Sequence, residues 1–376
     1  MLLHTDKFAL TANNITYGAA GDTIGYWNFF PAADGWGRIP VWGYATVTAS
    51  KCNELPAGER IYGYLPISTH VIVEPAKIMP ATFFDGAAHR RGLPPVYNSY
   101  QRVNADQAYF SGHEDEIAIF RPLFSTSFLV DDFLADGDFF GARNAVLTSA
   151  SSKTALGLAQ LLHDHRKDQI KVIGLTSPAN TAFVESTGYY DQIVAYADVA
   201  KLDAGEPTLQ VDFAGDLELL AKIHTHFGDQ LKYSCIVGAT HWQNLAAGNA
   251  ISAADKAPLP GAKPVFFFAP DRIVKRTADW GVPALCGASA TRSSRMPRHP
   301  RPGCVSFEAA VKKISKRSTA NSSPAKPIPL KVTFSRFSSR TVAARRSVRQ
   351  IDHRFGALEV RFREPSSGAS TERLLL

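Results

Sequence analysis

The segment from residue 145 to 268 alternates short apolar runs with stretches whose apolar residues recur at helical spacing. The runs are Ala145–Thr148, Lys171–Leu175, Gln192–Tyr196, Leu209–Phe213, Tyr233–Gly238 and Val265–Phe268. Between some of these runs, helices are predicted at 153–165, 180–186 and 216–227. A chain that alternates strand and helix builds parallel βαβ units, so the sequence predicts an α/β fold with a doubly wound Rossmann sheet.

The first 120 residues have a different character. The runs Val41–Val47, Arg60–Leu65 and His70–Pro75 are rich in β-branched and aromatic residues, with Pro and Gly at irregular intervals between them. This pattern predicts a barrel-like β domain with long loops. Residues 121–134 have helix-spaced apolar side chains and are expected to bridge into the parallel sheet.

The charge distribution sets the last part of the chain apart. Residues 281–376 carry 19 Lys and Arg against 5 Asp and Glu, whereas the preceding residues carry 22 against 29. All Trp and Tyr residues also precede residue 281. We therefore predict domains at 1–120 and 121–280, followed by a basic tail. The composition of that tail favours a shifted reading frame, with disordered or poorly packed chain, over a nucleic-acid-binding arm.

The four cysteines, Cys52, Cys235, Cys286 and Cys304, show no CxxC spacing. This argues against a zinc ribbon and against a disulfide scaffold in a chain of 376 residues. The chain also lacks a long uninterrupted apolar run and a recognisable secretory leader. We expect a cytoplasmic protein with a small-molecule substrate and no membrane partner. The sequence is also compatible with a homodimer.

A run of small hydroxylated residues follows the first strand of the series. A dinucleotide pyrophosphate needs a tight turn without bulky side chains, leading into a helix whose first N–H groups are unpaired. The residues that meet this need are Ser149, Ser151, Ser152, Lys153 and Thr154. The run is neither a GxGxxG motif nor a P-loop, and an ordinary Ser-rich helix cap is the alternative. The strands around it favour a cofactor site.

The ends of three further strands complete the predicted cofactor site. Thr176, Ser177 and Asn180 follow the second strand, where an NAD-preferring site usually places a carboxylate for the ribose hydroxyls. Without that carboxylate a 2′-phosphate is not repelled, which favours NADPH. At the fourth and fifth strand ends we expect cofactor contacts from Gly215, Gly238 and His241.

Three segments together resemble a known superfamily. Phe8–Gly18, Ser149–Gly157 and Gly174–Asn180 are similar to the medium-chain dehydrogenase/reductases, and nearest to their zinc-independent quinone oxidoreductases. Within that group the chain resembles an uncharacterised bacterial family. The resemblance covers residues 1 to about 280. It implies a GroES-like β-barrel substrate domain beside the Rossmann domain, and it implies a clipped start, because relatives have further strands before Phe8.

The resemblance also bears on catalysis. Zinc ligands of the metal-dependent members are missing from this sequence, so hydride transfer would be metal-free. Asn14 and Tyr17 match positions near which zinc-independent reductases place polar residues that face the nicotinamide, and Tyr97 is a second possible donor to the substrate oxygen. The alternative for each is a barrel residue whose polar group bonds to backbone.

Histidines could suggest a metal, but the spacing argues otherwise. His163 and His165, like His224 and His226, stand two residues apart on predicted helices and therefore point in different directions, so solvated helix histidines are expected. The sequence thus predicts an NADPH-dependent, zinc-free oxidoreductase that acts on a small carbonyl, enone or quinone. The alternative is a catalytically silent binding or structural protein with the same fold.

Overall fold

The computed structural model describes residues 1–19, 21–22, 25–33, 37–106, 108–238, 259–280, 328–329, 357–361 and 371–375. The chain divides into two compact units. The first unit comprises Met1–Asp106 and Thr319–Leu376, and the second comprises Gln107–Ser318.

The first unit is built on a seven-stranded antiparallel sheet with the strand order β4-β1-β2-β3-β7-β6-β5. Its strands are β1 (Leu2–Ala9), β2 (Pro40–Ala49), β3 (Arg60–Pro66), β4 (His70–Ile72), β5 (Pro75–Ala76), β6 (Thr82–Asp85) and β7 (Ser99–Arg102). The helical elements are α1 (Ala12–Ala19), η1 (Tyr26–Phe29), η2 (Ala88–Arg90), η3 (Pro95–Tyr97) and η4 (Val103–Ala105). The predicted strands at 41–47 and 60–65 are confirmed, and the run at 70–75 is split between β4 and β5.

Alternation along the long strands gives this unit two apolar clusters. Leu3, Val41, Ile61 and Phe83 belong to one core cluster and have no solvent exposure. A second cluster is aromatic and gathers around Tyr64. Gly43 permits the close approach of β1 and β2, because a Cβ at this position would lie 2.3 Å from the carbonyl oxygen of Lys7.

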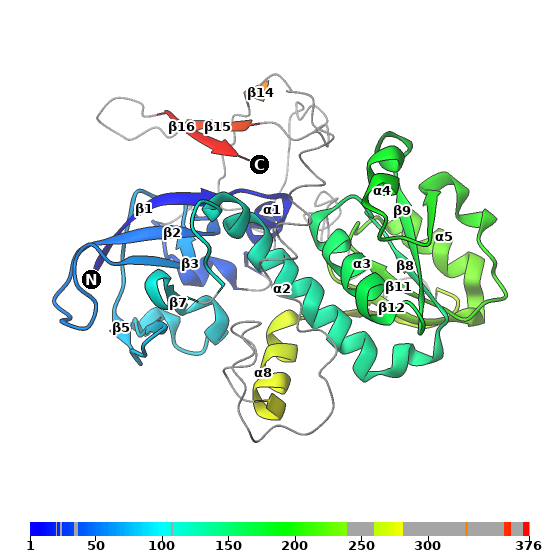
Figure 1. Ribbon diagram of the computed structural model, residues 1–376, viewed down its shortest axis with the longest axis horizontal. Helices are drawn as coiled ribbons and strands as arrows, with labels where there is room; N and C mark the ends of the chain where they lie inside the picture. The colour runs from blue at the N-terminus through cyan, green and yellow to red at the C-terminus, as the bar shows by residue number, and fades with distance from the viewer. Residues whose placement is uncertain are drawn as a thin grey trace. The chain divides into compact units, whose positions relative to one another are not determined.

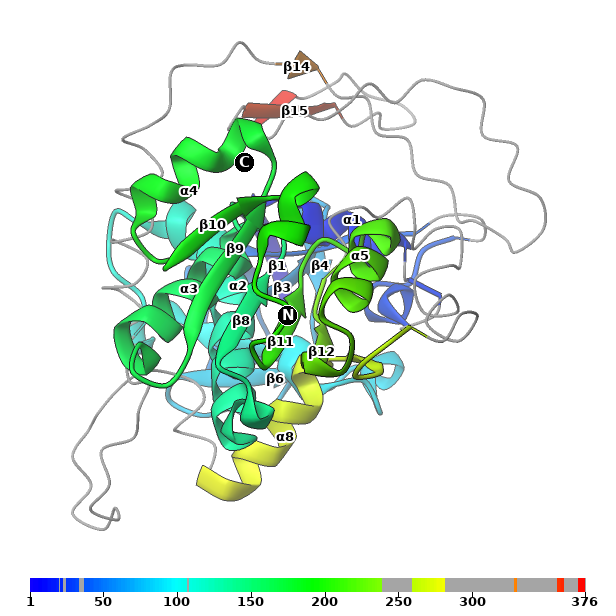
Figure 2. The same cartoon turned by 90° about the vertical axis from the view of Figure 1, so that its right-hand side faces the viewer.

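The second unit contains a six-stranded parallel sheet with the order β10-β9-β8-β11-β12-β13. The strands are β8 (Asn144–Leu147), β9 (Lys171–Thr176), β10 (Gln192–Ala195), β11 (Thr208–Asp212), β12 (Leu231–Ile236) and β13 (Pro264–Phe266). The helical elements are α2 (Glu114–Asp136), η5 (Asp138–Gly141), α3 (Lys153–Arg166), η6 (Pro178–Asn180), α4 (Thr181–Thr187), η7 (Tyr196–Lys201), α5 (Leu217–Phe227), η8 (Gly228–Gln230) and α8 (Ala269–Trp280). Numbered from the first strand of the unit, this order is 3-2-1-4-5-6, which is the Rossmann order. The predicted doubly wound sheet is therefore confirmed, and Figure 2 shows its strands side by side.

Both faces of the parallel sheet are covered, as Figure 1 shows with the strands between α3 and α5. Ala145 and Leu147 face a cluster that includes apolar residues of α2 and α3. Val146 points to the other face and packs with residues of α5 and η7. Successive side chains of a strand point to opposite faces, so even the short strand β8 anchors both halves of the core.

An ion-pair network joins α8 to α2 within the second unit. Arg272 and Arg276 are both buried, and each donates from Nε to Oδ2 of Asp132, at 2.6 and 2.7 Å. Asp136, one helical turn further along α2, pairs with both guanidinium groups as well. The i, i+4 spacing on each helix aligns the two arginines with the two carboxylates.

Two expectations need correction. Helix α2 begins at Glu114 rather than 121 and contains Pro122, which the sequence pattern places at its start. His224 is not solvated: it is fully buried, with Nδ1 3.0 Å from the Pro260 carbonyl oxygen and Nε2 3.0 Å from Ser234 Oγ. The 3.6-residue repeat places His224 on the buried face of α5, beside Leu220 and Ile223.

Little of the predicted basic tail is described. Its described residues form β14 (Ile328–Pro329), β15 (Ala357–Arg361) and β16 (Thr371–Leu375), which pair in a three-stranded sheet. Cys286 and Cys304 lie outside the described residues, whereas Cys52 and Cys235 are free thiols. Across the described part of the chain, no helix combines the length and the apolar character that crossing a membrane requires.

Candidate functional site

The strand order of the parallel sheet reverses between β8 and β11, and two polar side chains meet there. Thr148 follows β8 and donates from Oγ1 to Oδ1 of Asp212, the last residue of β11, at 2.6 Å. The N–H groups of Phe213 and Ala214 donate back to Thr148 Oγ1 at 2.9 and 3.1 Å. In open α/β sheets ligands bind outside the carboxyl ends of the strands at such a reversal.

The turn from β8 into α3 is tight and built from small residues. Ser149 has a φ of 48°, a left-handed conformation that is rare outside glycine. Its carbonyl oxygen accepts the N–H of Ser152 at 2.7 Å, and Ala150 donates its N–H to the Leu175 carbonyl oxygen of β9. Ser152 caps α3, since its hydroxyl accepts the N–H of Ala155 at 3.4 Å. Ser152 thus forms the helix cap that the sequence left open as the alternative reading of the Ser-rich run, within a strand–turn–helix.

The start of α3 offers donors to a ligand. Among the described residues the N–H groups of Ser151 and Thr154 have no hydrogen-bond partner. Lys153 occupies the first position of α3 and is half-buried, and burial lowers the pKa of its ammonium group to about 8. A helix N-terminus and an adjacent cation together favour an anion such as a phosphate.

The end of β9 lies beside this turn. Asn180 donates from Nδ2 to Ser151 Oγ at 3.1 Å, so the predicted second-strand residues do meet the predicted turn. Thr176 is fully buried, and its hydroxyl has no partner within the described structure. Ser177 and Asn180 are half-buried and flank the short helix η6. No carboxylate stands between Thr176 and Asn180.

Two glycines occupy the other strand ends. Gly215 has a φ of 64°, and the Asp212 carboxylate accepts its N–H and that of Ala214. Gly238 follows β12 and approaches the Phe213 backbone, because a Cβ there would lie 3.3 Å from the Phe213 carbonyl oxygen. His241, predicted as a cofactor contact, lies outside the described residues.

Asp212 and Thr148 were not among the site residues predicted from the sequence. The carboxyl group of Asp212 is buried, and this burial raises its pKa in spite of the hydrogen bonds from Thr148 and the two N–H groups. The available signal was a lone carboxylate at the end of a buried strand. A buried charge without a cation demands hydrogen bonds from its surroundings, so a carboxylate inside the run Leu209–Phe213 indicates a polar partner nearby.

In the first unit, both polar atoms of the Asn14 side chain form hydrogen bonds to backbone groups. Its side-chain oxygen accepts the N–H of Thr11 at 2.7 Å, and its Nδ2 donates to the Pro40 carbonyl oxygen at 2.9 Å. The side chain thereby caps α1 and ties it to β2. Bonding to backbone is the alternative that the sequence left open for this residue.

Tyr17 and Tyr97 lie together in the aromatic cluster of the first unit. The Tyr17 ring is 4.6 Å from that of Tyr26 and 5.7 Å from that of Tyr64, measured between ring centroids, and Tyr97 is 4.7 Å from Tyr64. Burial, with further contributions from neighbouring tyrosines, raises the pKa of both Tyr17 and Tyr97, so both phenols stay protonated at neutral pH. Tyr97 is half-buried, and its hydroxyl lies 3.5 Å from that of Tyr26.

The buried cation Arg90 holds the backbone of Tyr97 in place. Arg90 forms a buried ion pair with Asp85 at 3.1 Å and donates from Nη1 to the Tyr97 carbonyl oxygen at 3.3 Å. Its guanidinium group lies 4.5 Å from the centroid of the Phe30 ring. No sequence pattern points to Arg90, since a single arginine in a loop has no periodicity or motif around it. Within the described residues no cluster of His, Cys, Asp and Glu has the makings of a metal site.

A sequence family matches most of the chain. The family described as "Protein of unknown function (DUF2855)" matches residues 8–311. The chain belongs to this family. The expectation of an uncharacterised family is thus confirmed, and the match extends past the change of composition at residue 281.

Several solved structures are similar to the chain at low identity. CurA from Vibrio vulnificus in complex with NADPH is 12% identical with a TM-score of 0.46, covering 88% of this chain and 82% of its own. The quinone oxidoreductase from Thermus thermophilus is 13% identical with a TM-score of 0.41, covering 84% and 87%. The YhdH oxidoreductase from Salmonella enterica in complex with NADP is 15% identical with a TM-score of 0.34, and the match spans 63% of this chain and 65% of YhdH. No curated protein matches the chain.

Proposed function

We propose that the second unit binds NADPH and that the protein is an NADPH-dependent oxidoreductase acting on a small carbonyl, enone or quinone. One observation carries the proposal: a tight small-residue turn leads into the N-terminus of α3 at the strand-order reversal of a Rossmann sheet.

The residues at this edge fit a dinucleotide phosphate. Ser151, Thr154 and Lys153 would hold the pyrophosphate through backbone N–H groups, hydroxyls and one cation. Ser177 and Asn180 would lie near the adenosine ribose, where the missing carboxylate leaves room for the charge of a 2′-phosphate. Gly215 and Gly238 would let the cofactor approach the backbone. The bound cofactor would supply a hydride.

The protein's own contribution to the chemistry would be a hydrogen bond to the substrate oxygen. Charge builds on that oxygen as a carbonyl or enone is reduced, and a protonated phenol stabilises it. Tyr97 suits this role best, because its side chain is half-buried and its raised pKa keeps the proton in place. Tyr17 is the second donor that we propose. Asn14 would act only by holding α1 against β2.

Two measurements test the proposal. Titration of the full chain with NADPH and NADH, followed by nicotinamide fluorescence, should show binding with a preference for NADPH. NADPH oxidation should then be measured against a panel of enones, quinones and aldehydes. We expect Tyr97→Phe to lower kcat with little change in NADPH affinity. A chain that binds NADPH but turns over nothing in the panel would favour the silent binding protein, and absence of NADPH binding would reject the proposal as a whole.

A further inference from the structure

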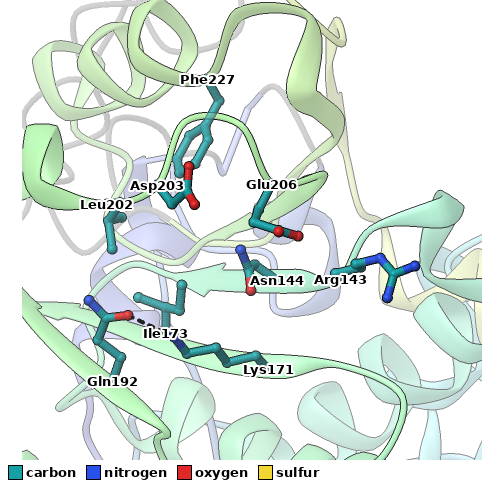
Figure 3. A pocket seen from close by; sticks show the side chains of 9 residues that line it. All are labelled: Arg143, Asn144, Lys171, Ile173, Gln192, Leu202, Asp203, Glu206 and Phe227. Carbon is teal, nitrogen blue, oxygen red and sulfur yellow. Dashed lines mark hydrogen bonds between the residues drawn. The ribbon is translucent and has the colours of Figure 1, made fainter.

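A cavity lies at the amino-terminal ends of the strands of the parallel sheet, opposite to the carboxyl ends where the α3 turn lies. Its volume is about 370 Å³, and the first residues of three neighbouring strands line it: Asn144 of β8, Lys171 of β9 and Gln192 of β10. Figure 3 shows these residues below the space and the segment with Asp203 and Glu206 above it. Small-molecule pockets have volumes of about 300–1,000 Å³, so the space suits a small ligand.

The floor of the cavity holds a polar side chain. Asn144 is 9% exposed, and among the described residues no hydrogen bond to its side-chain amide is present. Figure 3 shows the amide projecting into the space between the strand and the loop above. A side-chain amide offers both a donor and an acceptor, so a ligand with either kind of polar group can pair with it.

Charges of opposite sign line the two sides of the cavity. On the strand side are Arg143 and Lys171, and Lys171 donates from Nζ to Gln192 Oε1 at 3.0 Å. On the loop side are Asp203 and Glu206, which both precede β11. Within the part of the chain that the structure describes, no salt bridge joins the two sides, so each side keeps its charge for a ligand.

The remaining lining is apolar. Ile173 of β9, Leu202 and the ring of Phe227 at the end of α5 close the inner wall. A ligand that suits this wall carries a hydrocarbon or aromatic group beside its polar groups. The lining is therefore complementary to a small molecule that carries three groups: an anionic group, a cationic group and an apolar side chain.

We propose that this cavity binds a free α-amino acid with an apolar side chain. The carboxylate would lie at Lys171, the ammonium group at Asp203 and Glu206, and the side chain against Phe227. Asn144 would pair with the polar end of the ligand. The inference is independent of the proposed reductase activity, because the cavity lies at the amino edge of the sheet, away from the α3 turn.

Calorimetric titration of the full chain with L-leucine and L-phenylalanine tests the proposal. N-acetyl-L-leucine removes the cation and L-leucinamide removes the anion, while both keep the side chain. We expect the free amino acids to bind and each blocked analogue to bind at least about tenfold more weakly, since each loses a charge-assisted contact. No binding of either free amino acid, or equal binding of the blocked analogues, would overturn the proposal.

Two variants and one control variant test whether the ligand binds in this cavity. Asn144→Ala and Glu206→Gln should each weaken leucine binding about tenfold. Glu185→Gln is the matched control, because Glu185 is an exposed carboxylate on α4 outside the cavity. Unchanged affinity in Glu206→Gln would refute the site even if Asn144→Ala failed to fold.

Discussion

The pKa of Lys153, a cation at the proposed phosphate site, lies near neutrality. We therefore predict that the Kd for NADPH depends on pH. Burial lowers that pKa to about 8, so the ammonium form that would bind phosphate predominates below pH 8 and is lost above it. With this pKa the side chain is about nine-tenths charged at pH 7 and about one-tenth charged at pH 9.

The size of the effect follows from the contact that is lost. A charge-assisted hydrogen bond contributes about 1.5–3 kcal/mol, a factor of about ten to one hundred and fifty in affinity. Weighted by the charged fraction, the Kd for NADPH should rise roughly five- to tenfold between pH 7 and pH 9. The titration begins at pH 7 because a phosphate monoester has its second pKa near about 6.

Fluorescence titrations of NADPH across this range measure the slope. In Lys153→Gln we expect the affinity at pH 7 to fall to about the wild-type value at pH 9 or below, and the curve to become flat. Lys171→Gln is the control, since Lys171 lies at the amino edge of the sheet and its loss should leave the slope intact. A wild-type Kd that stays constant from pH 7 to pH 9, or a slope that survives in Lys153→Gln, would refute the assignment.

Three further predictions concern stability. Asp132→Ala should destabilise the second unit by about 1.5–3 kcal/mol in urea unfolding, because the two buried guanidinium groups lose one shared acceptor and keep the more exposed Asp136 as their remaining shared partner; a loss below about 1 kcal/mol would contradict the network. Gly43→Ala should cost the first unit about 1–3 kcal/mol, since its Cβ would press on β1, and a neutral effect in the same assay would show that the strands can separate freely. Burial raises the folded-state pKa of Asp212, so the wild type should gain stability relative to Asp212→Asn as pH falls through that pKa; thermal unfolding from pH 7 to pH 4 that shows a constant difference would count against this.

The sequence predicts the parallel sheet well because its signal is local. Each of the six strands is a short apolar run, and each predicted helix has one apolar face, as in α5, where Leu219, Leu220 and Ile223 are buried. The same locality explains the errors. Helix α2 contains Pro122, which the residue pattern reads as a start, although the helical residues from Glu114 onward precede it and supply the acidic first turn.

The sequence predicts the candidate site only where all the residues of a feature lie in one continuous segment. The turn at 149–154 contains its small residues and its helix start in one run, so the sequence reveals it. The link from Thr148 to Asp212 joins residues 64 apart, and the support of Tyr97 by Arg90 depends on an ion pair with Asp85. Such contacts exist only after folding, and neither composition nor periodicity contains them.

The two ends of the parallel sheet can serve different ligands because every strand runs in the same direction. At the carboxyl edge the chain turns into helix N-termini, which present N–H groups and favour anions, as at Ser152 and Asp216, the caps of α3 and α5. At the amino edge the strands begin with side chains, so recognition there depends on amides and paired charges such as Asn144 and Lys171. Strand β8 connects the two edges with only four residues, and its three apolar members are fully buried. A rigid, fully packed strand of this length fixes the position of both edges, and each site can therefore be tested by substitutions that leave the other one in place.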